Sequence, residues 1–300
     1  MEAASAGGPD KKERVAIKKR SQLKAIWFRF KKNKLAVVGL TLLLCMILVA
    51  IFADVIVNYE QYAVTQNMKE RLQTPTREHI FGTDHYGRDL FARIIHGSRI
   101  SIFLGLVTIG IALAAGSIIG AASGYYGGTV DNILMRIMDV FLAIPSILLA
   151  ISIVAALGPG LMNILIAMSV SQIPRFARIV RASIMSIMGQ EFIEAAKACG
   201  TKDRRIILRH IIPNAIGPII VQATLSMATT ILTISSLSFV GLGIEPPTPE
   251  WGSMLSDGRV QMRNHPYLVI TPGIAIVLAV MALNLIGDGL RDALDPKLKN

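Results

Sequence analysis

The chain has 300 residues, of which 52% are hydrophobic and 17% charged, and its formal net charge is +11. A typical soluble domain carries about 25% charged residues, and here the apolar residues gather in long runs rather than at helical or strand spacing. This composition indicates a protein embedded in a lipid bilayer. The basic residues cluster beside apolar runs instead of forming one stripe, which argues against a nucleic-acid-binding protein.

Six stretches of the sequence are apolar and about long enough to cross a membrane as helices. They are residues 35–53, 100–122, 133–157, 161–179, 214–244 and 267–286. Gly158-Pro159-Gly160 reads as a tight turn between the third and the fourth, and Pro145 and Pro174 can kink the spans that contain them. The short alternating segments of a β-barrel are absent. The sequence therefore predicts an all-α membrane protein with six transmembrane helices.

The bias of Lys and Arg predicts the orientation of these helices, because basic loops stay in the cytosol. The first 34 residues carry eleven basic side chains before the first span. A cleaved signal peptide would have a shorter apolar core and a cleavage site before Asp54, so we favour an uncleaved anchor. Alternation places both termini in the cytosol and residues 58–99 and 241–266 outside. Arg93 and Arg99, beside a span on the outer side, oppose this assignment.

These assignments divide the chain into successive regions. They are a basic cytosolic leader (1–34), a first transmembrane helix (35–57), an extracytoplasmic segment (58–99), a five-helix core (100–290) with a cytosolic loop at 181–213, and a cytosolic tail (291–300). Within the second span, Gly116, Gly120 and Gly124 repeat every four residues, which favours close helix packing.

Residues 190–212, here named the lever, predict two short helices joined by a glycine turn. The first helix ends at Gly200, and Thr201 is expected to cap the second, with Asp203 in its first turn and Pro213 as its stop. Two small alanines on the first helix would let it enter a groove on a partner, and an acidic side chain beside them would meet a basic one. We therefore expect a docking surface, with a plain connector as the alternative, and assign to it Glu191, Glu194, Ala195, Ala196, Gly200, Thr201, Asp203, Arg204 and Pro213.

Glu194-Ala195-Ala196, Gly200 and Ile212-Pro213 resemble the EAA signature of the permeases of ABC importers. Nearly all of the chain from about Arg29 to Leu298 is similar to the C-type subunit of the dipeptide, oligopeptide and nickel branch. The motifs that carry this similarity are Phe81-Gly82-Thr83-Asp84, Gly87-Arg88-Asp89, Arg93 and Gly97, Asp139 to Pro145, Ser238-Phe239, Gly241-Leu242-Gly243, Pro246, Pro249, Trp251-Gly252, Asn284, Gly287-Asp288, Leu290-Arg291-Asp292 and Leu294-Asp295-Pro296.

The resemblance implies the type I permease fold and a prokaryotic plasma-membrane location. It also implies a sister permease, two cytosolic ATPases that dock on the lever, and an extracytoplasmic substrate-binding protein. ATP and Mg²⁺ are expected on the ATPases, because this sequence has no GxxxxGK[ST] phosphate loop and no metal-ligand spacing. Short peptides are the expected substrate, and nickel or another small solute is the alternative.

Two other function classes fit the sequence less well. An ion-coupled secondary transporter would carry ionisable residues at mid-membrane, whereas the charges here fall near the span ends. An intramembrane enzyme would need paired catalytic groups at membrane depth, and we find none in the sequence. We therefore expect a transport subunit without catalytic residues, cofactor or metal, whose substrate-lining residues are not identified.

Several charged and aromatic residues outside the lever are expected to be structural. For Asp84, Arg88 and Asp89 we expect turn and salt-bridge roles, with contact to the binding protein as the alternative. Arg136 and Asp139, three residues apart, predict an ion pair along one helix.

The remaining residues of this kind lie near the membrane surfaces. Asp288, Arg291 and Asp292 are compatible with either an ATPase contact or a charged helix end. Trp27, Trp251 and Tyr267 would suit an aromatic belt at the membrane surface.

Overall fold

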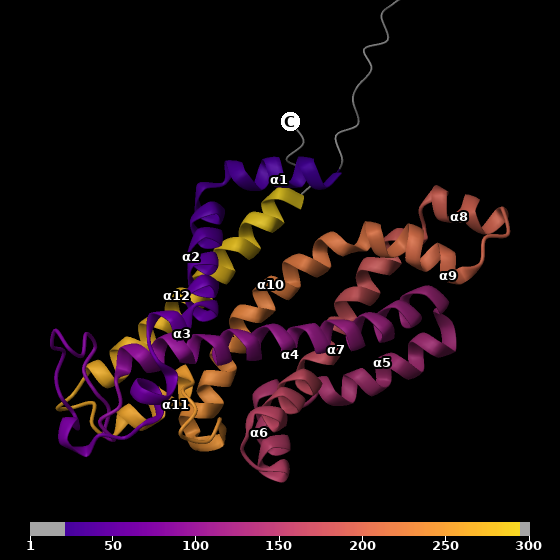
Figure 1. Cartoon of the computed structure of the whole chain (residues 1–300). Helices are drawn as coiled ribbons and strands as arrows, with labels where there is room; N and C mark the ends of the chain where they lie inside the picture. The colour runs from indigo at the N-terminus through magenta and orange to yellow at the C-terminus, as the bar shows by residue number, and fades with distance from the viewer. Residues whose placement is uncertain (1–21, 295–300) are drawn as a thin grey trace, which may run out of the picture.

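The computed structural model describes residues 22–294, within which the named secondary-structure elements are all helices (Figure 1). The predicted leader before Gln22 and the tail after Leu294 lie outside the described residues. The α-helices are α1 (Gln22–Lys32), α2 (Lys34–Ile51), α3 (Ala53–Ile56), α4 (Leu90–Tyr126), α5 (Gly128–Leu142), α6 (Ser146–Leu157), α7 (Leu161–Met188), α8 (Glu191–Ala198), α9 (Asp203–Ile206), α10 (Ile212–Leu237), α11 (Trp251–Arg259) and α12 (Tyr267–Leu294). Shorter 3₁₀ or π turns are η1 (Tyr59–Val64), η2 (Met68–Glu70), η3 (Ile207–Ile211) and η4 (Ser238–Leu242).

Several helices are long and apolar enough to cross a membrane. Among the described residues, α2, α4, α12 and the helical stretch 203–242 qualify singly, and α5 with α6 qualifies as a bent pair. The chain is thus an all-helical membrane protein with four or five candidate spans by this criterion. Helix α7 is not among them, and its second half carries Arg175, Arg178 and Arg181. The count of six remains a prediction.

The predicted third span is wrong as a single helix. The chain bends by 80° between α5 and α6. Pro145 stands at this break with φ −52° and ψ 129°, outside the helical region. A proline ring disfavours the helical conformation of the residue before it and removes one backbone donor, and here the helix ends and a new one begins. The predicted turn at Gly158-Pro159-Gly160 is confirmed, since α6 ends at Leu157 and α7 begins at Leu161.

Helix α4 is longer at both ends than the predicted second span. It begins at Leu90, where the Asp89 side chain accepts a hydrogen bond from the Ala92 amide at 2.8 Å and caps the helix. It continues to Tyr126, and only Gly127 separates it from α5. The stretch 123–132, which separates the second and third predicted spans, is therefore mostly helical.

Helices α4 and α7 pack with their backbones in close contact through the predicted glycine face. An added Cβ at Gly116 would lie 2.6 Å from the Cβ of Phe176 and 2.9 Å from the amide nitrogen of Ala177. At Gly124 it would lie 3.0 Å from the carbonyl oxygen of Arg181. Small residues at this spacing allow such contact between membrane helices, so the packing interpretation is confirmed.

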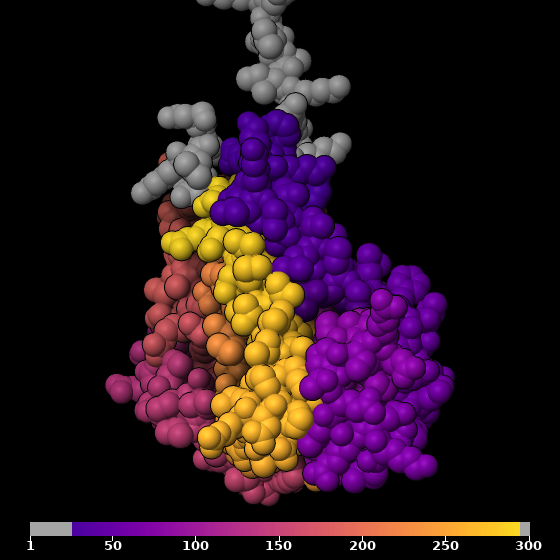
Figure 2. Space-filling model, turned by 90° about the vertical axis from the view of Figure 1, so that its left-hand side faces the viewer, coloured from indigo at the N-terminus to yellow at the C-terminus, as the bar shows by residue number. Residues whose placement is uncertain are grey.

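The remaining helices pack beside this pair, and several of them gather toward one end of the molecule or the other. Helix α12 packs against α2 and α10, and Figure 2 shows it beside the segment that precedes α4. Helix α1, the lever and the end of α12 lie toward one end in Figure 1. Residues 58–89, here named the lobe, and α11 lie toward the other end.

The α4–α7 contact yields a stability prediction. In Gly120→Ala, the new methyl would meet the Ala177 carbonyl and lie 2.8 Å from the Cβ of Val180, so the helices must separate. We expect a loss of about 1–3 kcal/mol, typical of overpacking. The measurement is the thermal unfolding midpoint of the purified chain in detergent.

Gly110→Ala is the matched control, because Gly110 lies on the same helix with no atom within 4 Å of an added Cβ. Its better helix propensity, worth up to about 1 kcal/mol, should leave the midpoint unchanged or raised. Equal losses in both variants would contradict the packing role.

Candidate coupling site and charged lobe

The lever has the predicted form of two helices about a glycine. Helix α8 carries Glu191 and Glu194 in its first turn, and Gly200 follows it with φ +69°, a conformation that favours glycine. The predicted cap at Thr201 is wrong. The Thr201 amide donates to the Ala196 carbonyl at 3.1 Å and so belongs to the end of α8, whereas Lys202 precedes α9 without a side-chain cap.

Pro213 does not stop the second helix, which corrects another prediction. The π turn η3 joins α9 to α10, and the stretch 203–242 runs as one helix. Pro213 falls in the first turn of α10. A proline is tolerated there because it lacks only an amide that the helix start does not require. The second half of the lever is therefore continuous with a candidate span.

The inner face of the lever is fixed to the helix bundle by apolar packing. Ile193 of α8 is fully buried, and it clusters with Ile206, Ile211 and, from α7, Ile184. Ala196 is partly buried in the same cluster. Of the two alanines predicted at the surface, Ala195 is exposed and Ala196 is not.

The outward side of the lever carries most of the predicted docking residues. Glu191, Glu194, Ala195, Gly200 and Arg204 are all exposed. They form a rigidly backed surface, because the opposite side of α8 is anchored in the core. The structure thus brings these residues together, and their contact with an ATPase remains a prediction.

Asp203 has a partner within the chain. Its carboxylate accepts a hydrogen bond from the Tyr125 hydroxyl at 2.5 Å, and the Lys197 ammonium lies 5.5 Å from the centroid of the Tyr125 ring. Tyr125 is near the end of α4, so both halves of the lever contact the longest helix. Asp203 thus has an internal structural role, which the sequence did not indicate.

Two ion pairs join α5 to α7 near the lever. Arg181 donates to both oxygens of Asp131, with Nε at 2.6 Å and Nη2 at 2.5 Å. Arg178 pairs with Asp139 at 2.7 Å. The predicted pair between Arg136 and Asp139 is therefore wrong, because the guanidinium on the adjacent helix occupies the carboxylate instead. These pairs line an open groove between the two helices.

The lobe is built on buried charges, as predicted for Asp84, Arg88 and Asp89. The Arg88 guanidinium, only 1% exposed, donates to Asp84 at 2.6 Å. Asp89 contacts the His79 ring at 2.7 Å. These pairs are local and hold the turn that precedes α4.

Arg93 and Arg99, which opposed the predicted orientation, both have partners within the protein, Arg93 in the interior and Arg99 at the surface. Arg93 donates to the carbonyls of Ala63 and Pro247 at 2.9 and 3.1 Å and lies 3.5 Å from Asp84. Arg99 donates to the Ile51 carbonyl at 2.8 Å and pairs with Asp54 at 2.7 Å. It thereby caps the end of α2.

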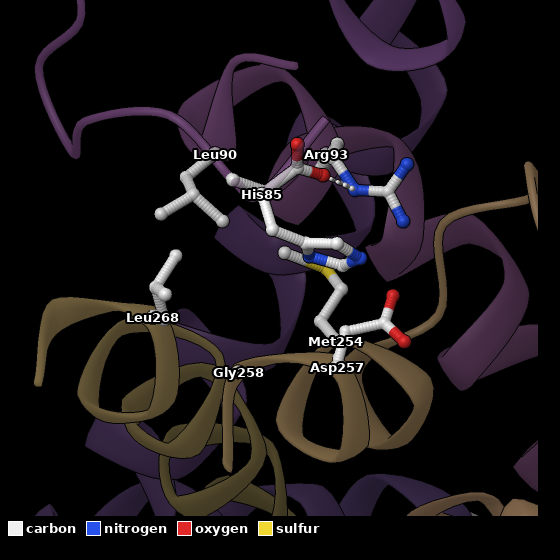
Figure 3. Close-up of a pocket in the computed structure, with 8 residues that line it drawn as sticks. His85, Leu90, Arg93, Met254, Asp257, Gly258 and Leu268 are labelled. Carbon is white, nitrogen blue, oxygen red and sulfur yellow. Dashed lines mark ion pairs between the residues drawn. The ribbon is translucent and has the colours of Figure 1, made fainter. Parts of the chain in front are cut away.

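A small pocket lies between the lobe and α11 (Figure 3). Among its lining residues are His85 and Asp257, whose side chains approach each other beside Met254 in the figure. Burial lowers the pKa of His85 below its ordinary 6.5, against the opposing effect of Asp84. Burial raises the pKa of Asp257 above its ordinary 3.8. The pocket therefore disfavours charge on both groups.

Two residues near α11 have roles that the sequence did not reveal. Glu250 is fully buried and caps α11 by accepting hydrogen bonds from the amides of Gly252 and Ser253 at 2.9 and 2.8 Å. Trp251, predicted for a membrane-surface belt, is 1% exposed and donates to the Ile94 carbonyl at 3.1 Å. An acidic residue directly before a helix was the available signal for the cap.

Comparison with known proteins shows the family to which the chain belongs. The profile described as "Binding-protein-dependent transport system inner membrane component" matches residues 112–300, more than half of the chain. The chain belongs to this family. Residues 21–75 also match the profile described as "N-terminal TM domain of oligopeptide transport permease C". The resemblance to the C-type permeases of this branch, stated from the sequence, is thereby confirmed.

Curated relatives cover most of this permease. The dipeptide transport system permease protein DppC of Alkalihalophilus pseudofirmus is 52% identical over 91% of this chain and 89% of its own length. The di/tripeptide transport system permease protein DppC of Pseudomonas aeruginosa is 41% identical over 93% and 94% of the two chains. The glutathione transport system permease protein GsiD of Escherichia coli is 44% identical over 91% and 90%.

Solved structures show the same fold at low sequence identity. An inward-facing form of the MetNI methionine ABC transporter matches with a TM-score of 0.56 and 19% identity, over 68% of this permease and 97% of that chain. An amino acid ABC transporter matches with a TM-score of 0.54 and 16% identity, over 66% and 92%. The type I ABC permease fold is thus confirmed.

The anchoring of the lever yields a second prediction. Ile193→Ala should remove the packing of α8 and cost about 2–5 kcal/mol, as for other buried isoleucines. Because the loss is local, hydrogen exchange of residues 190–200 should accelerate. Phe192→Ala is the control, since Phe192 is 40% exposed. Unchanged exchange in Ile193→Ala would contradict the anchoring.

The lobe yields a prediction for pH. With its folded pKa below 6.5, His85 binds protons more readily in the unfolded chain, so its contribution to stability falls as the pH drops through 6.5. We expect the thermal midpoint in His85→Gln to fall less from neutral to mildly acidic pH than in the unsubstituted permease. His265→Gln is the control, and an unaltered pH dependence in His85→Gln would rule out this role.

Proposed function

We propose that this chain is the transmembrane permease subunit of an ATP-driven importer of short peptides. The observation that carries the proposal is the set of relatives, at 41–52% identity over about nine tenths of the chain, that are named for dipeptides, di- or tripeptides and glutathione. All of these are peptides of two or three residues. They favour peptides over the nickel alternative.

The proposed arrangement has six transmembrane helices, with α7 as the fourth, and both termini in the cytosol of a prokaryotic cell. Helix α1, the lever and the end of α12 share one end of the molecule, as this topology requires (Figure 1). Arg93 is buried and Arg99 is paired with Asp54, which weakens the charge argument against this topology. The lobe would then face outward, toward an extracytoplasmic binding protein.

We propose that two cytosolic ATPases, which hold ATP and Mg²⁺, dock on the levers of this chain and of a sister permease. The exposed residues Glu191, Glu194 and Ala195 offer the contact. Closure of the ATPases would move the lever, and the continuous helix 203–242 would carry that movement into the membrane. Transport is then an exchange between inward- and outward-facing states that ATP binding biases.

The test is uptake of a labelled dipeptide into proteoliposomes that hold the complete complex and its binding protein. Glu194→Lys and Gly200→Val should lower uptake by about tenfold or more while ATP hydrolysis continues, a loss of about 1.4 kcal/mol in coupling. Gly200→Val acts through the backbone, because φ +69° strains a β-branched residue.

Glu245→Lys is the matched control, an equal charge change at an exposed site in the other half of the molecule. It should transport at the unsubstituted rate. If the unsubstituted complex imports no peptide, the substrate assignment is refuted. Full uptake in both lever variants would refute the coupling site alone.

A further inference from the structure

Helix α1 presents an aromatic and basic face that the import mechanism does not use. Its sequence, QLKAIWFRFKK, contains four basic residues and no acidic residue. Trp27 and Phe28 are 49% and 52% exposed. The Lys31 ammonium lies 4.9 Å from the centroid of the Trp27 ring, and that of Lys32 lies 4.8 Å from the Phe28 ring. Rings and ammonium groups are therefore paired along one side of the helix.

The opposite side of α1 is clamped to the bundle, so the orientation of this face is fixed. Phe30 is 3% exposed and packs with Ala36 of α2 and with Ile286 and Ala293 of α12. An added Cβ at Gly289 would lie 3.2 Å from the Phe30 ring, so α12 needs a residue without a side chain at this position. Helix α1 cannot turn its aromatic side inward without losing this packing.

The corner between α1 and α2 is fixed by Asn33. Its side-chain nitrogen Nδ2 donates to the Asp292 carboxylate of α12 at 3.0 Å, and its side-chain oxygen accepts from the Ala36 amide at 3.2 Å, which caps α2. Helices α2 and α12 are both candidate spans. Helix α1 lies across their ends in Figure 1. The ends of membrane-spanning helices lie near the membrane–water interface.

We propose that this face of α1 binds anionic phospholipid headgroups of the adjacent leaflet. Tryptophan favours the headgroup region, where the ring is shielded from water and its N–H stays solvated. Basic residues beside it are attracted to phosphodiester groups at an anionic surface. A partner protein fits less well, because α1 offers only positive charge beside its rings and the face is level with the span ends.

The test uses the full chain reconstituted in phosphatidylcholine vesicles, with Trp27 as the probe. The chain has two tryptophans, so subtraction of the Trp27→Phe spectrum isolates Trp27 while the buried Trp251 stays in place. Vesicles receive equal small fractions of either phosphatidylglycerol or phosphatidylcholine brominated near the top of the acyl chain. We expect brominated phosphatidylglycerol to quench Trp27 severalfold more than brominated phosphatidylcholine.

The variant Lys31→Gln/Lys32→Gln should lose this excess, and Lys31→Arg/Lys32→Arg should keep it. The matched control, Lys69→Gln/Arg77→Gln, removes two exposed charges from the lobe and should also keep it. Three results would overturn the proposal. They are equal quenching by the two lipids, an excess that remains in Lys31→Gln/Lys32→Gln, and an excess that is lost in the lobe control as well. Absence of quenching by both lipids would show that protein covers the face, and would overturn it as well.

Discussion

The contact between α4 and α7 is the constraint on which the rest of the structure depends. Three glycines allow the two backbones to approach, and the residues of α7 that they meet run from Ile173 to Ile184. At 1.5 Å per residue, the 37 residues of α4 extend about 55 Å. This helix begins at the lobe with the Asp89 cap and ends at Tyr126, one residue after Tyr125, which contacts both halves of the lever. The lobe and the lever are therefore held by one rigid element.

The sequence predicted those features that depend on local composition. The apolar runs predicted the long helices α2, α4, α10 and α12, and Gly200 predicted the turn of the lever, since both signals act within a few residues. Two prolines show the limit. Pro145 ends a helix and Pro213 lies inside a continuous one, although each follows an apolar stretch. The difference arises because the π turn η3 interrupts the regular hydrogen bonding just before Pro213, so a residue without an amide is tolerated there. Ile206 and Ile211 pack this turn into the core.

Pairing of charges was the least predictable feature, because the partners come from distant segments. Arg93 binds carbonyls of the lobe and of the chain before α11, and Arg99 binds the end of α2. Asp139 pairs across to α7 rather than along its own helix. The positive-inside pattern counts charges that would otherwise face the membrane surface. Charges that are paired within the fold contribute less to this pattern, and the sequence does not reveal which charges are paired.

The packing divides the helices into two groups that α4 and α10 connect. Helices α1, α2 and α12 share a core around Phe30 and Ala36, while α7, α8, α9 and η3 share another around Ile193. Helix α10 contacts α12, α4 and α7, and it is continuous with the lever through η3. A force applied to the exposed side of α8 thus reaches the group of α1, α2 and α12 through α10, which is continuous with the lever, and through α4. Because packed cores resist continuous deformation, such a force should shift α10 as a body against α12 rather than bend the lever.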